Sequence, residues 1–469
     1  MKRREFFRNA AFGAAASSFL FPAQGCSSSQ LLVNGQGKGR TAKNIIFLVS
    51  DGMSTGTLNM AELLLRRKEG RGSHWLDLYR DQRAARALMD TASSSSLVTD
   101  SAASSSSWGG GHRVPNGHLN IGSNGEEYLP ILQKFKRAGK KVGCVTTVPI
   151  THATPAGFCV NSKSRNSQPE IAIDYLKLRF DVMMGGGAKY FEGREDGRNL
   201  FAEYAEQGFQ VSREKSTMLK ADSGKPVLGI FDKDGLPYEI DRLHQPNLQE
   251  KVPSLAEMTT KAIDLMKSHT HGFVLQVEGG KVDWAAHSND APALLYDQIA
   301  FDEAIHIAIN FAAKDQNTLV IITTDHGNSN PGLYYGSKAD ENFDKFLTIR
   351  RSNDSLLMGI KKEETPAQIL EKIKEFQGID ITIEQSQNIK SKYLYLDGDG
   401  VYNAYKLPFK EYGQITADHT SVSFGGMDHT GDFVELAMFG PGSERLKPFV
   451  INTDLHQLML DAAEVENKF

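Results

Sequence analysis

The chain has 469 residues, of which 40% are apolar and 23% charged, a composition that is typical of a globular protein and excludes fibrous, collagen-like and disordered classes. Its 53 Lys and Arg residues against 57 Asp and Glu residues give a net charge of −4, and without a long basic run the sequence predicts no nucleic-acid-binding role. The three cysteines, Cys26, Cys144 and Cys159, are too few for a scaffold held together by disulfides.

The N-terminus has the pattern of an export signal, which we assign to residues 1–26. Paired arginines and two aromatic residues in 1–8 precede a small and apolar stretch from Ala10 to Phe21, a pattern that resembles a twin-arginine signal. The stretch of about 12 residues is shorter than the roughly 20 that cross a bilayer, so it is not a membrane anchor. We therefore expect a protein exported from a bacterial cytoplasm.

A small residue, Gly25, precedes Cys26, as in lipoprotein processing sites. Two alternatives stay open: lipidation of Cys26, which anchors the chain to a membrane, or ordinary cleavage nearby, which leaves a periplasmic protein. Residues 27–42 are rich in Ser, Gly and Gln and predict a flexible tether. The catalytic domain is expected to span 43–469.

From Lys43 onward, apolar runs of strand length alternate with amphipathic helical windows. The predicted strands are 44–50, 141–147, 180–184, 272–278, 317–323 and 433–439. The predicted helices are 57–68, 102–107, 127–138, 199–206, 254–268, 291–313 and 453–463. Because continuous apolar strands are typical of parallel sheets covered on both faces, we expect an α/β fold that is doubly wound, with a mostly parallel central sheet flanked by helices.

Two blocks break this alternation. Residues 335–420 are charged and Tyr-rich, contain one predicted helix at 365–377, and predict a cap or crown-type insertion. Residues 208–250 are irregular. Cys144 and Cys159 lie in apolar stretches, and the sequence leaves open whether they are buried thiols or a disulfide.

Polar side chains follow three of the predicted strands. Asp51 follows the first strand, Glu278 ends another, and Asp325 with His326 follows a third. A single Asp at a strand end is more often a turn former or helix cap, but ligands of α/β sheets bind beyond the carboxyl ends of the strands, where these three ends meet. Asp283 and His287 add a pair spaced by one helical turn. Histidine nitrogens with carboxylates suit zinc, and carboxylates with a hydroxyl suit magnesium.

Ser101 is a candidate nucleophile. It lies at the predicted start of a helix of small residues, where backbone N–H groups favour an anionic oxygen or a phosphate. The alternative is that Ser101 is only a helix cap in a serine-rich segment. Because no Gly-x-Ser-x-Gly motif surrounds it, activation by a coordinated metal is the mechanism we expect.

Taken together, these segments resemble the successive motifs of the alkaline phosphatase family, in the family's order and across roughly residues 43 to 465. The motifs are Ser50–Met53, Val98–Ser104, Thr146–Thr147, His152–Gly157, Gly185–Phe191, Val277–Asp283 with His287, Thr324–His326 and Asp428–Gly431.

The resemblance implies a serine nucleophile and three metal ions. Ser101 would become phosphoserine. One Zn²⁺ would be held by Asp283, His287 and His429, and a second by Asp51, Asp325 and His326 together with the Ser101 oxygen. One Mg²⁺ would be held by Asp51, Glu278 and Thr154.

The resemblance also assigns the groups around these metals. Arg165 would bind two phosphate oxygens, although Lys163 is a rival on local grounds. His152 would reach the magnesium only through water. Trp284 stands where relatives often carry a Lys or His that contacts phosphate through water. His419 lies in a segment similar to that of His429, which we prefer because the strand and glycines after it match the family.

These assignments imply an alkaline phosphatase that hydrolyses a broad range of phosphate monoesters to an alcohol and inorganic phosphate. Because many relatives dimerise, the resemblance also suggests a homodimer. Phosphodiesterases and sulfatases are alternatives within the superfamily, but diesterases usually lack an arginine placed like Arg165, and no formylglycine motif of sulfatases is present. A surface-anchored binding protein with an inactive site is a further alternative. Competent residues at every ligand position argue against it.

Overall fold

The computed structural model describes residues 39–394 and 407–468. The predicted export signal, Cys26 and most of the tether lie outside the described residues, so the structure leaves those predictions as they stand. Within the described part of the chain, no helix combines the length and the apolar character that crossing a bilayer requires.

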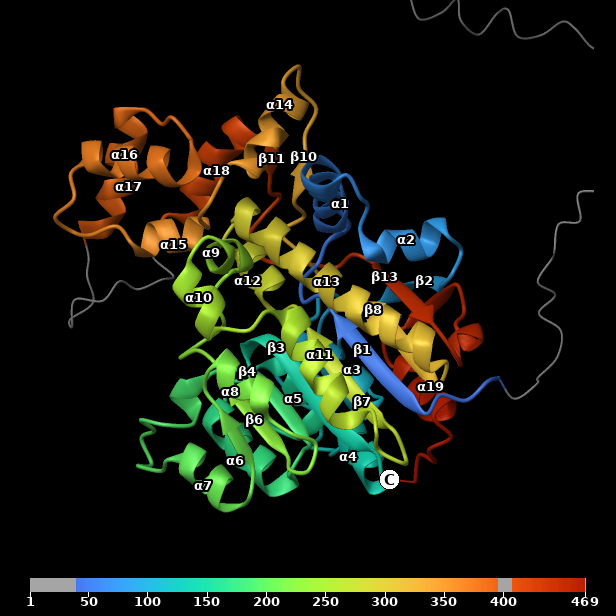
Figure 1. The fold of residues 1–469 in the computed structure, drawn as a ribbon. Coiled ribbons are helices and arrows are strands. Elements are labelled where there is room, and N and C mark those ends of the chain that lie inside the picture. The colour runs from blue at the N-terminus through green and yellow to red at the C-terminus, as the bar shows by residue number, and fades with distance from the viewer. Residues whose placement is uncertain (1–38, 395–406, 469) are drawn as a thin grey trace, which may run out of the picture. The chain divides into compact units, whose positions relative to one another are not determined.

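In the described part of the chain, ten strands form one sheet in the order β14-β2-β13-β8-β1-β7-β3-β4-β6-β5 (Figure 1). All neighbours are parallel except β13, which runs antiparallel to both β8 and β2. The strands are β1 (Asn44–Val49), β2 (Ala85–Asp90), β3 (Lys141–Pro149), β4 (Val182–Gly186), β5 (Gln210–Ser212), β6 (Val227–Ile230), β7 (Phe273–Glu278), β8 (Thr318–Thr323), β13 (Val434–Phe439) and β14 (Phe449–Ile451). The predicted α/β fold with a mostly parallel sheet is confirmed.

Both faces of the sheet are covered, because alternate residues of the central strands enter two different cores. In β1, Ile46 and Leu48 pack into one core, while Ile45 and Phe47 pack into the other, and all four are fully buried. Each such side chain contributes roughly 1.5–3 kcal/mol by leaving water. The continuous apolar runs therefore indicate the doubly wound fold correctly.

The first core is covered by α1 (Thr55–Glu69), α2 (His74–Arg80), α11 (Leu255–Met266), α12 (Lys281–His287) and α13 (Ala291–Asp315). The second is covered by α3 (Ser101–Gly110), α4 (Ile131–Arg137), α5 (Ala153–Cys159), α6 (Gln168–Leu178), α7 (Leu200–Glu206) and α19 (Asp454–Ala462). Short elements connect them: α8 (Lys215–Lys220), α9 (Glu239–Leu243), α10 (Pro246–Lys251), β9 (Gly327–Asn328), β10 (Gly332–Leu333), β11 (Val422–Ser423), β12 (His429–Thr430), η1 (Ala188–Tyr190) and η5 (Ser443–Arg445).

The structure corrects some local predictions. The block at 208–250 is not irregular throughout, since β5 and β6 extend the central sheet there. The helix predicted from 127 begins at Ile131, because Pro130 disfavours helical geometry in the residue before it. Strand β2 was missed because its arginine interrupts the apolar pattern, and only two of its residues are fully buried.

The predicted insertion is a group of helices with its own core. It contains α14 (Ala339–Phe343), η2 (Asp344–Leu347), α15 (Asn353–Met358), α16 (Pro366–Gln377), α17 (Ile383–Ser391), η3 (Lys392–Leu394) and α18 (Phe409–Thr420). Buried side chains such as Leu357, Ile369 and Tyr412 form this third core, which lies to one side of the sheet in Figure 1. The helix predicted at 365–377 corresponds to α16, which Thr365 caps. The shorter helices around it were not predicted.

Helix α3 and helix α5 approach each other closely enough to require glycine. A Cβ atom on Gly109 would lie 1.9 Å from the carbonyl oxygen of Gly157, and one on Gly157 would lie 2.4 Å from the Ser105 hydroxyl. The same hydroxyl donates to the Thr154 carbonyl over 2.6 Å. This contact fixes α3, and with it Ser101, against α5. Nearby, the buried Cys144 and Cys159 are free thiols whose sulfur atoms lie 3.8 Å apart.

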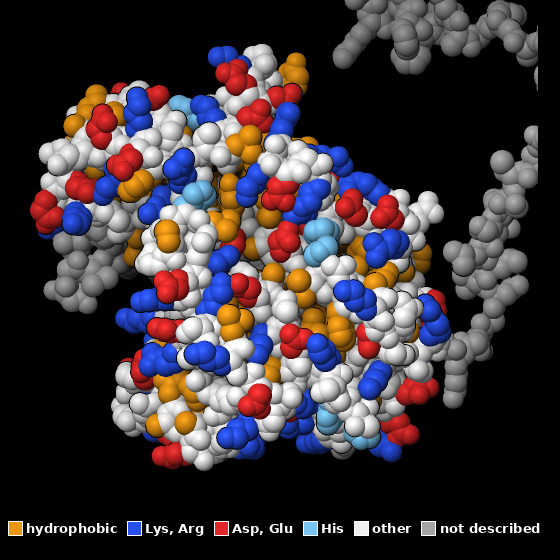
Figure 2. Space-filling model, in the orientation of Figure 1, with side chains coloured by type: hydrophobic (Ala, Val, Ile, Leu, Met, Phe, Trp, Pro, Cys, Tyr) orange, Lys and Arg blue, Asp and Glu red, His pale blue; other side chains and the backbone are white. Residues whose placement is uncertain are grey.

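Charged side chains of both signs are interspersed over the face drawn in Figure 2. No single colour forms a continuous stripe across that face.

Candidate active site

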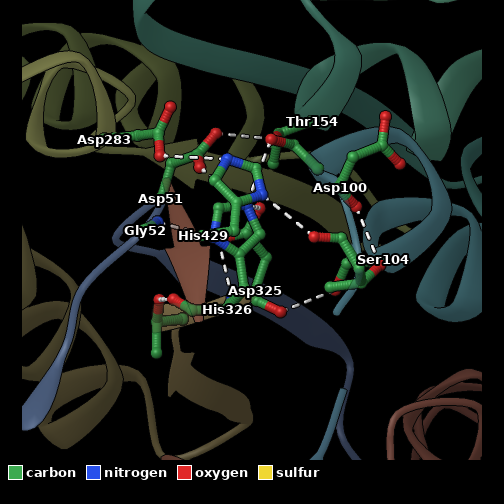
Figure 3. Close-up of polar contacts among 12 residues, drawn as sticks. Asp51, Gly52, Asp100, Ser104, Thr154, Asp283, Asp325, His326 and His429 are labelled. Carbon is green, nitrogen blue, oxygen red and sulfur yellow. Dashed lines mark hydrogen bonds and ion pairs between the residues drawn. The ribbon is translucent and has the colours of Figure 1, made fainter. Parts of the chain in front are cut away.

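The register of the three central strands brings the predicted acidic residues together. Val49 at the end of β1 pairs with Glu278 of β7 on one side and with Thr323 of β8 on the other. Asp51 and Asp325 follow those ends within two residues, so the carboxylates meet although they are far apart in sequence. Figure 3 shows Asp51, Asp325, His326 and His429 turned toward one another.

Ser101 begins α3 at this edge. Its Oγ lies 3.3 Å from Nε2 of His326, and the side chain is 1% exposed. Asp100 is the N-cap of α3, where its carboxylate accepts from the Ala103 N–H over 2.9 Å. The alternative in which Ser101 itself caps the helix therefore does not hold, because Asp100 does so.

The first group of ligand atoms consists of Asp283, His287 and His429. Asp283 and His287 lie one turn apart on α12, with Nε2 of His287 3.4 Å from the Asp283 carboxylate. Nε2 of His429 lies 3.6 Å from the same carboxylate and 3.1 Å from Nε2 of His287.

The protonation of these rings is set by backbone carbonyls. Nδ1 of His287 faces the Met427 carbonyl over 2.6 Å and Nδ1 of His429 faces the Thr99 carbonyl over 2.9 Å, so each Nδ1 carries the proton and donates it. Burial and His326 lower the pKa of His429 to about 4. The two Nε2 atoms face each other beside the Asp283 carboxylate, an arrangement that suits a cation between them.

The second group consists of Asp51, Asp325 and His326, all fully buried. Nδ1 of His326 faces the Gly327 carbonyl, while Nε2 lies 3.2 Å from Asp325 and 3.6 Å from Asp51. Burial alone would lower the pKa of His326, but the Asp325 and Asp283 charges outweigh it and raise that pKa. Positive charge is thus favoured here, next to the Ser101 hydroxyl.

The third group consists of Asp51, His152 and Glu278. Thr154 donates its hydroxyl to Asp51 over 3.0 Å. Thr146 donates its hydroxyl to Oε2 of Glu278. The buried Nδ1 of His152 has no hydrogen-bond partner among the described residues. A ring nitrogen of His152 lies within 4.8 Å of carboxylate oxygens of Asp51 and Glu278, and whether it reaches the magnesium directly or through water stays a prediction.

Three buried carboxylate oxygens of the second and third groups have no hydrogen-bond partner among the described residues: Asp51 Oδ1, Glu278 Oε1 and Asp325 Oδ2, the last of which lies 3.2 Å from Nε2 of His326. Burial, reinforced by the neighbouring carboxylates, raises the pKa of Asp51 well above its usual range, and burial raises that of Glu278 to about 7. An unpaired buried carboxylate is costly, and these oxygens all belong to the second and third groups. The donor set therefore fits divalent cations.

A cationic side chain contacts Asp100, the residue that precedes the serine. Arg165 bonds to the Asp100 carboxylate through Nη1 over 3.0 Å and donates from Nη2 to Nε2 of His152 over 3.1 Å. Its planar fork is suited to two phosphate oxygens. Lys163, the local rival, is exposed on the same loop.

The remaining predicted residues lie as follows. The Trp284 ring meets the His152 ring edge-on, with 6.2 Å between the ring centroids. His419 lies on α18, near the charges of Lys345 and Asp380, and is not part of any of the three groups found in the described residues. The geometry therefore favours His429 over His419.

Sequence reasoning did not single out Asp100, Thr146 and Asn328. Asp100 contacts both α3 and Arg165, Thr146 donates to Glu278, and Asn328 donates to Asp283 over 2.7 Å. The preference for Asp before a helix is a signal that could have identified Asp100. The contacts of Thr146 and Asn328 have no local signature.

The fold, the buried serine and the gathered carboxylates and imidazoles define a class of metal-dependent hydrolytic enzyme. The chain belongs to the alkaline phosphatase family, whose model matches residues 42–465. It is therefore a phosphatase, and both family and fold support hydrolysis of phosphate monoesters.

Named relatives agree with this assignment. The chain is 32% identical to alkaline phosphatase 4 of Bacillus subtilis over 352 residues, which cover 73% of this chain and 72% of the relative. It is 30% identical to the alkaline phosphatase of Escherichia coli K12 over 347 residues, 64% of this chain and 73% of the relative. The solved structure of Thermus thermophilus alkaline phosphatase superposes with a TM-score of 0.85 at 30% identity and covers 96% of both chains.

Proposed function

We propose that this phosphatase hydrolyses phosphate monoesters to an alcohol and inorganic phosphate through a phosphoserine at Ser101, in a site that holds two Zn²⁺ and one Mg²⁺. The observation that carries the proposal is the 3.3 Å approach of the Ser101 hydroxyl to His326, inside a cluster of buried acceptors that requires cations. Asp283, His287 and His429 would hold one zinc, Asp51, Asp325 and His326 the other, and Asp51, Glu278 and Thr154 the magnesium. When bound, these ions ionise the serine hydroxyl and a water and stabilise the leaving oxygen.

The chain's own residues orient the reaction. Helix α3 aims the Ser101 oxygen at phosphorus, and the Arg165 fork binds two non-bridging oxygens, whose charge it neutralises. The new bond forms between Ser101 Oγ and phosphorus while the bond to the alcohol oxygen breaks, and the alcohol leaves with a proton from water. In the second half, water attacks phosphorus from the side that the alcohol left. Ser101 and inorganic phosphate are then released.

The rim of the site distinguishes this chain from relatives with a basic residue at the position of Trp284. An indole cannot supply positive charge, so phosphate is held mainly by Arg165 and the metal ions. We expect phosphate release and the pH optimum to differ accordingly. Because recognition rests on the phosphoryl group, a broad range of small phosphomonoesters is expected as substrates.

The test is hydrolysis of a chromogenic phosphomonoester at alkaline pH. We expect activity that a chelator abolishes and that zinc with magnesium restores, and no activity for Ser101→Ala. Ser107→Ala is the matched control, since Ser107 is buried on the same helix but donates only to the Ala103 carbonyl. Full activity of Ser101→Ala would exclude the proposed nucleophile. A strong preference for a diester would assign the protein to the phosphodiesterases instead.

Intact-mass measurement after quenching in acid tests the intermediate separately. Wild-type protein mixed with substrate is expected to gain one phosphoryl group, which peptide mapping places on Ser101. Protein that turns over substrate without ever carrying a phosphoryl group would favour direct attack by water and contradict this part of the proposal.

The assignments outside the described residues stay proposals. We propose export directed by residues 1–26, followed either by lipidation of Cys26 or by cleavage near it, and the mass of the mature N-terminus distinguishes the two. Homodimer formation is likewise a prediction, which light scattering of the purified protein tests.

A further inference from the structure

Lys281, at the start of α12, is a buried cation whose charge acts on the buried carboxyl groups of Asp297 and Asp354 but forms no ion pair within the described residues. It is 6% exposed, and no carboxylate of the described residues lies within ion-pair distance of its ammonium. The ammonium instead lies 3.5 Å from the centre of the Tyr238 ring and 4.7 Å from that of the Trp284 ring. Such contacts are strongest when water is excluded, as it is around Lys281 and the buried Tyr238. Lys281 therefore makes cation–π contacts with two aromatic rings.

Trp284 has two close neighbours. The Lys281 ammonium lies over the indole, and Gly235 lies so near that a Cβ atom there would be 2.8 Å from Cζ3 of the indole and 3.4 Å from Cδ of Lys281. The indole in turn meets the His152 ring edge-on, at an interplanar angle of 78°. The ring of Trp284 thus restricts the orientation of the His152 ring.

His152 connects Trp284 to Arg165, the residue proposed to bind phosphate. Because a guanidinium has only N–H donors, Nε2 of His152 accepts from Nη2 of Arg165 over 3.1 Å. The Asp100 carboxylate holds the other side of the guanidinium. A ring that turned away would leave Arg165 held on one side only.

We propose that Lys281 is a positioning residue for substrate binding: through Trp284 and His152 it fixes the Arg165 guanidinium in the orientation that binds the phosphoryl group. The inference rests on the proposed function, because it assumes that Arg165 binds phosphate. It assigns a part in phosphate affinity to a buried lysine that lies outside the three ligand groups.

The experiment compares Lys281→Met with wild type in the metal-loaded enzyme. We expect the KM for a chromogenic phosphomonoester and the inhibition constant of inorganic phosphate each to rise about fivefold, the size of one lost cation–π contact, with kcat changed by less than about twofold. Lys281→Arg, which keeps the cation over the rings, should restore both constants. Lys134→Met is the matched control, since Lys134 is an equally buried lysine on α4.

Fluorescence gives a readout that does not depend on turnover. The chain has three tryptophans, and Trp75 and Trp108 are fully buried while Trp284 is partly exposed. Lys281→Met should therefore shift the emission of Trp284, and Lys134→Met should not.

A double-mutant cycle with Arg165→Ala separates the inference from the proposed function. If Lys281 acts through Arg165, Lys281→Met raises KM in the wild-type background and adds nothing to Arg165→Ala. An active wild-type enzyme in which Arg165→Ala raises KM but Lys281→Met leaves KM and phosphate inhibition unchanged would overturn the inference alone. If Arg165→Ala leaves KM unchanged, the proposed phosphate-binding role of Arg165 is wrong, and the positioning role of Lys281 is wrong with it.

Gly235→Ala keeps the inference testable if Lys281→Met does not fold. Its methyl group would lie 2.8 Å from Cζ3 of the indole and 3.4 Å from Cδ of Lys281, so it displaces the indole while the lysine keeps its charge, and it should reproduce the increase in KM. A folded Gly235→Ala protein with unchanged KM would contradict the proposed role of Trp284.

Discussion

His429→Ala tests the proposed zinc site most directly. The substitution removes one of three ligand side chains, and it removes the Nε2 atom that lies 3.1 Å from His287 and 3.6 Å from Asp283. His287 and Asp283 remain on α12. We expect the protein to fold and to lose affinity for one zinc ion.

The magnitude follows from the number of ligands. Zinc sites with four protein ligands bind with about 10–16 kcal/mol, so one ligand contributes roughly 3 kcal/mol. Its loss weakens binding on the order of a hundredfold and, at a fixed excess of free zinc, removes about 2.7 kcal/mol of the stabilisation that zinc provides. The metal-free protein should lose less stability, because without zinc the substitution removes no bond to a metal ion.

The assay measures zinc per chain by elemental analysis after equilibration at a series of free zinc concentrations, and Tm with and without zinc. His419→Ala is the matched control, since His419 lies in a similar sequence context on α18 but outside the ligand groups found in the described residues. It should bind zinc as wild type does. Undiminished zinc affinity of His429→Ala, or loss of zinc in His419→Ala, would refute the assignment.

Three further substitutions test other parts of the structure. Gly109→Ala places a methyl group 1.9 Å from the Gly157 carbonyl oxygen and should lower the free energy of unfolding by about 1–3 kcal/mol, measured by denaturant titration. Asp100→Asn weakens a charge-assisted bond to Arg165 and should raise the inhibition constant of inorganic phosphate about tenfold; an unchanged constant would separate Asp100 from phosphate binding. Burial raises the pKa of Asp290 to about 7, so the folded chain keeps a proton that the unfolded chain releases near pH 4. The free energy of unfolding should therefore fall as the pH rises from about 4 to about 7, and Asp290→Asn should flatten this fall. A series of Tm measurements across this pH range in which Asp290→Asn behaves as wild type would contradict the raised pKa.

Much of the fold could be predicted because its central strands are apolar throughout. β1 and β8 are buried on both faces, so their sequences contain no polar alternation and indicate a parallel sheet. β2 and β6 could not be predicted in the same way. β2 lies near the sheet edge with only two of its six residues buried, and β6 is a four-residue strand in a polar block.

The sequence by itself determined the type of chemistry, because the candidate ligands stand in short motifs: Asp51 after one strand, Asp283 and His287 at helical spacing, and Asp325 beside His326. Their resemblance to a known family then assigned each a role. What the motifs could not determine is which groups share a site, because that depends on pairs distant in the chain.

Only the tertiary structure decided those pairs. His287 and His429 are 142 residues apart in sequence, yet their Nε2 atoms lie 3.1 Å apart. The same holds for the ring nitrogen of His152 among the third group of ligand atoms and for Lys281 behind Trp284. Local spacing specifies which side chains a strand end or a helical turn presents. Strand register and the packing of α3 against α5 specify which other side chains those residues contact. Charge and burial shift pKa values and favour cation binding only once these side chains are in contact.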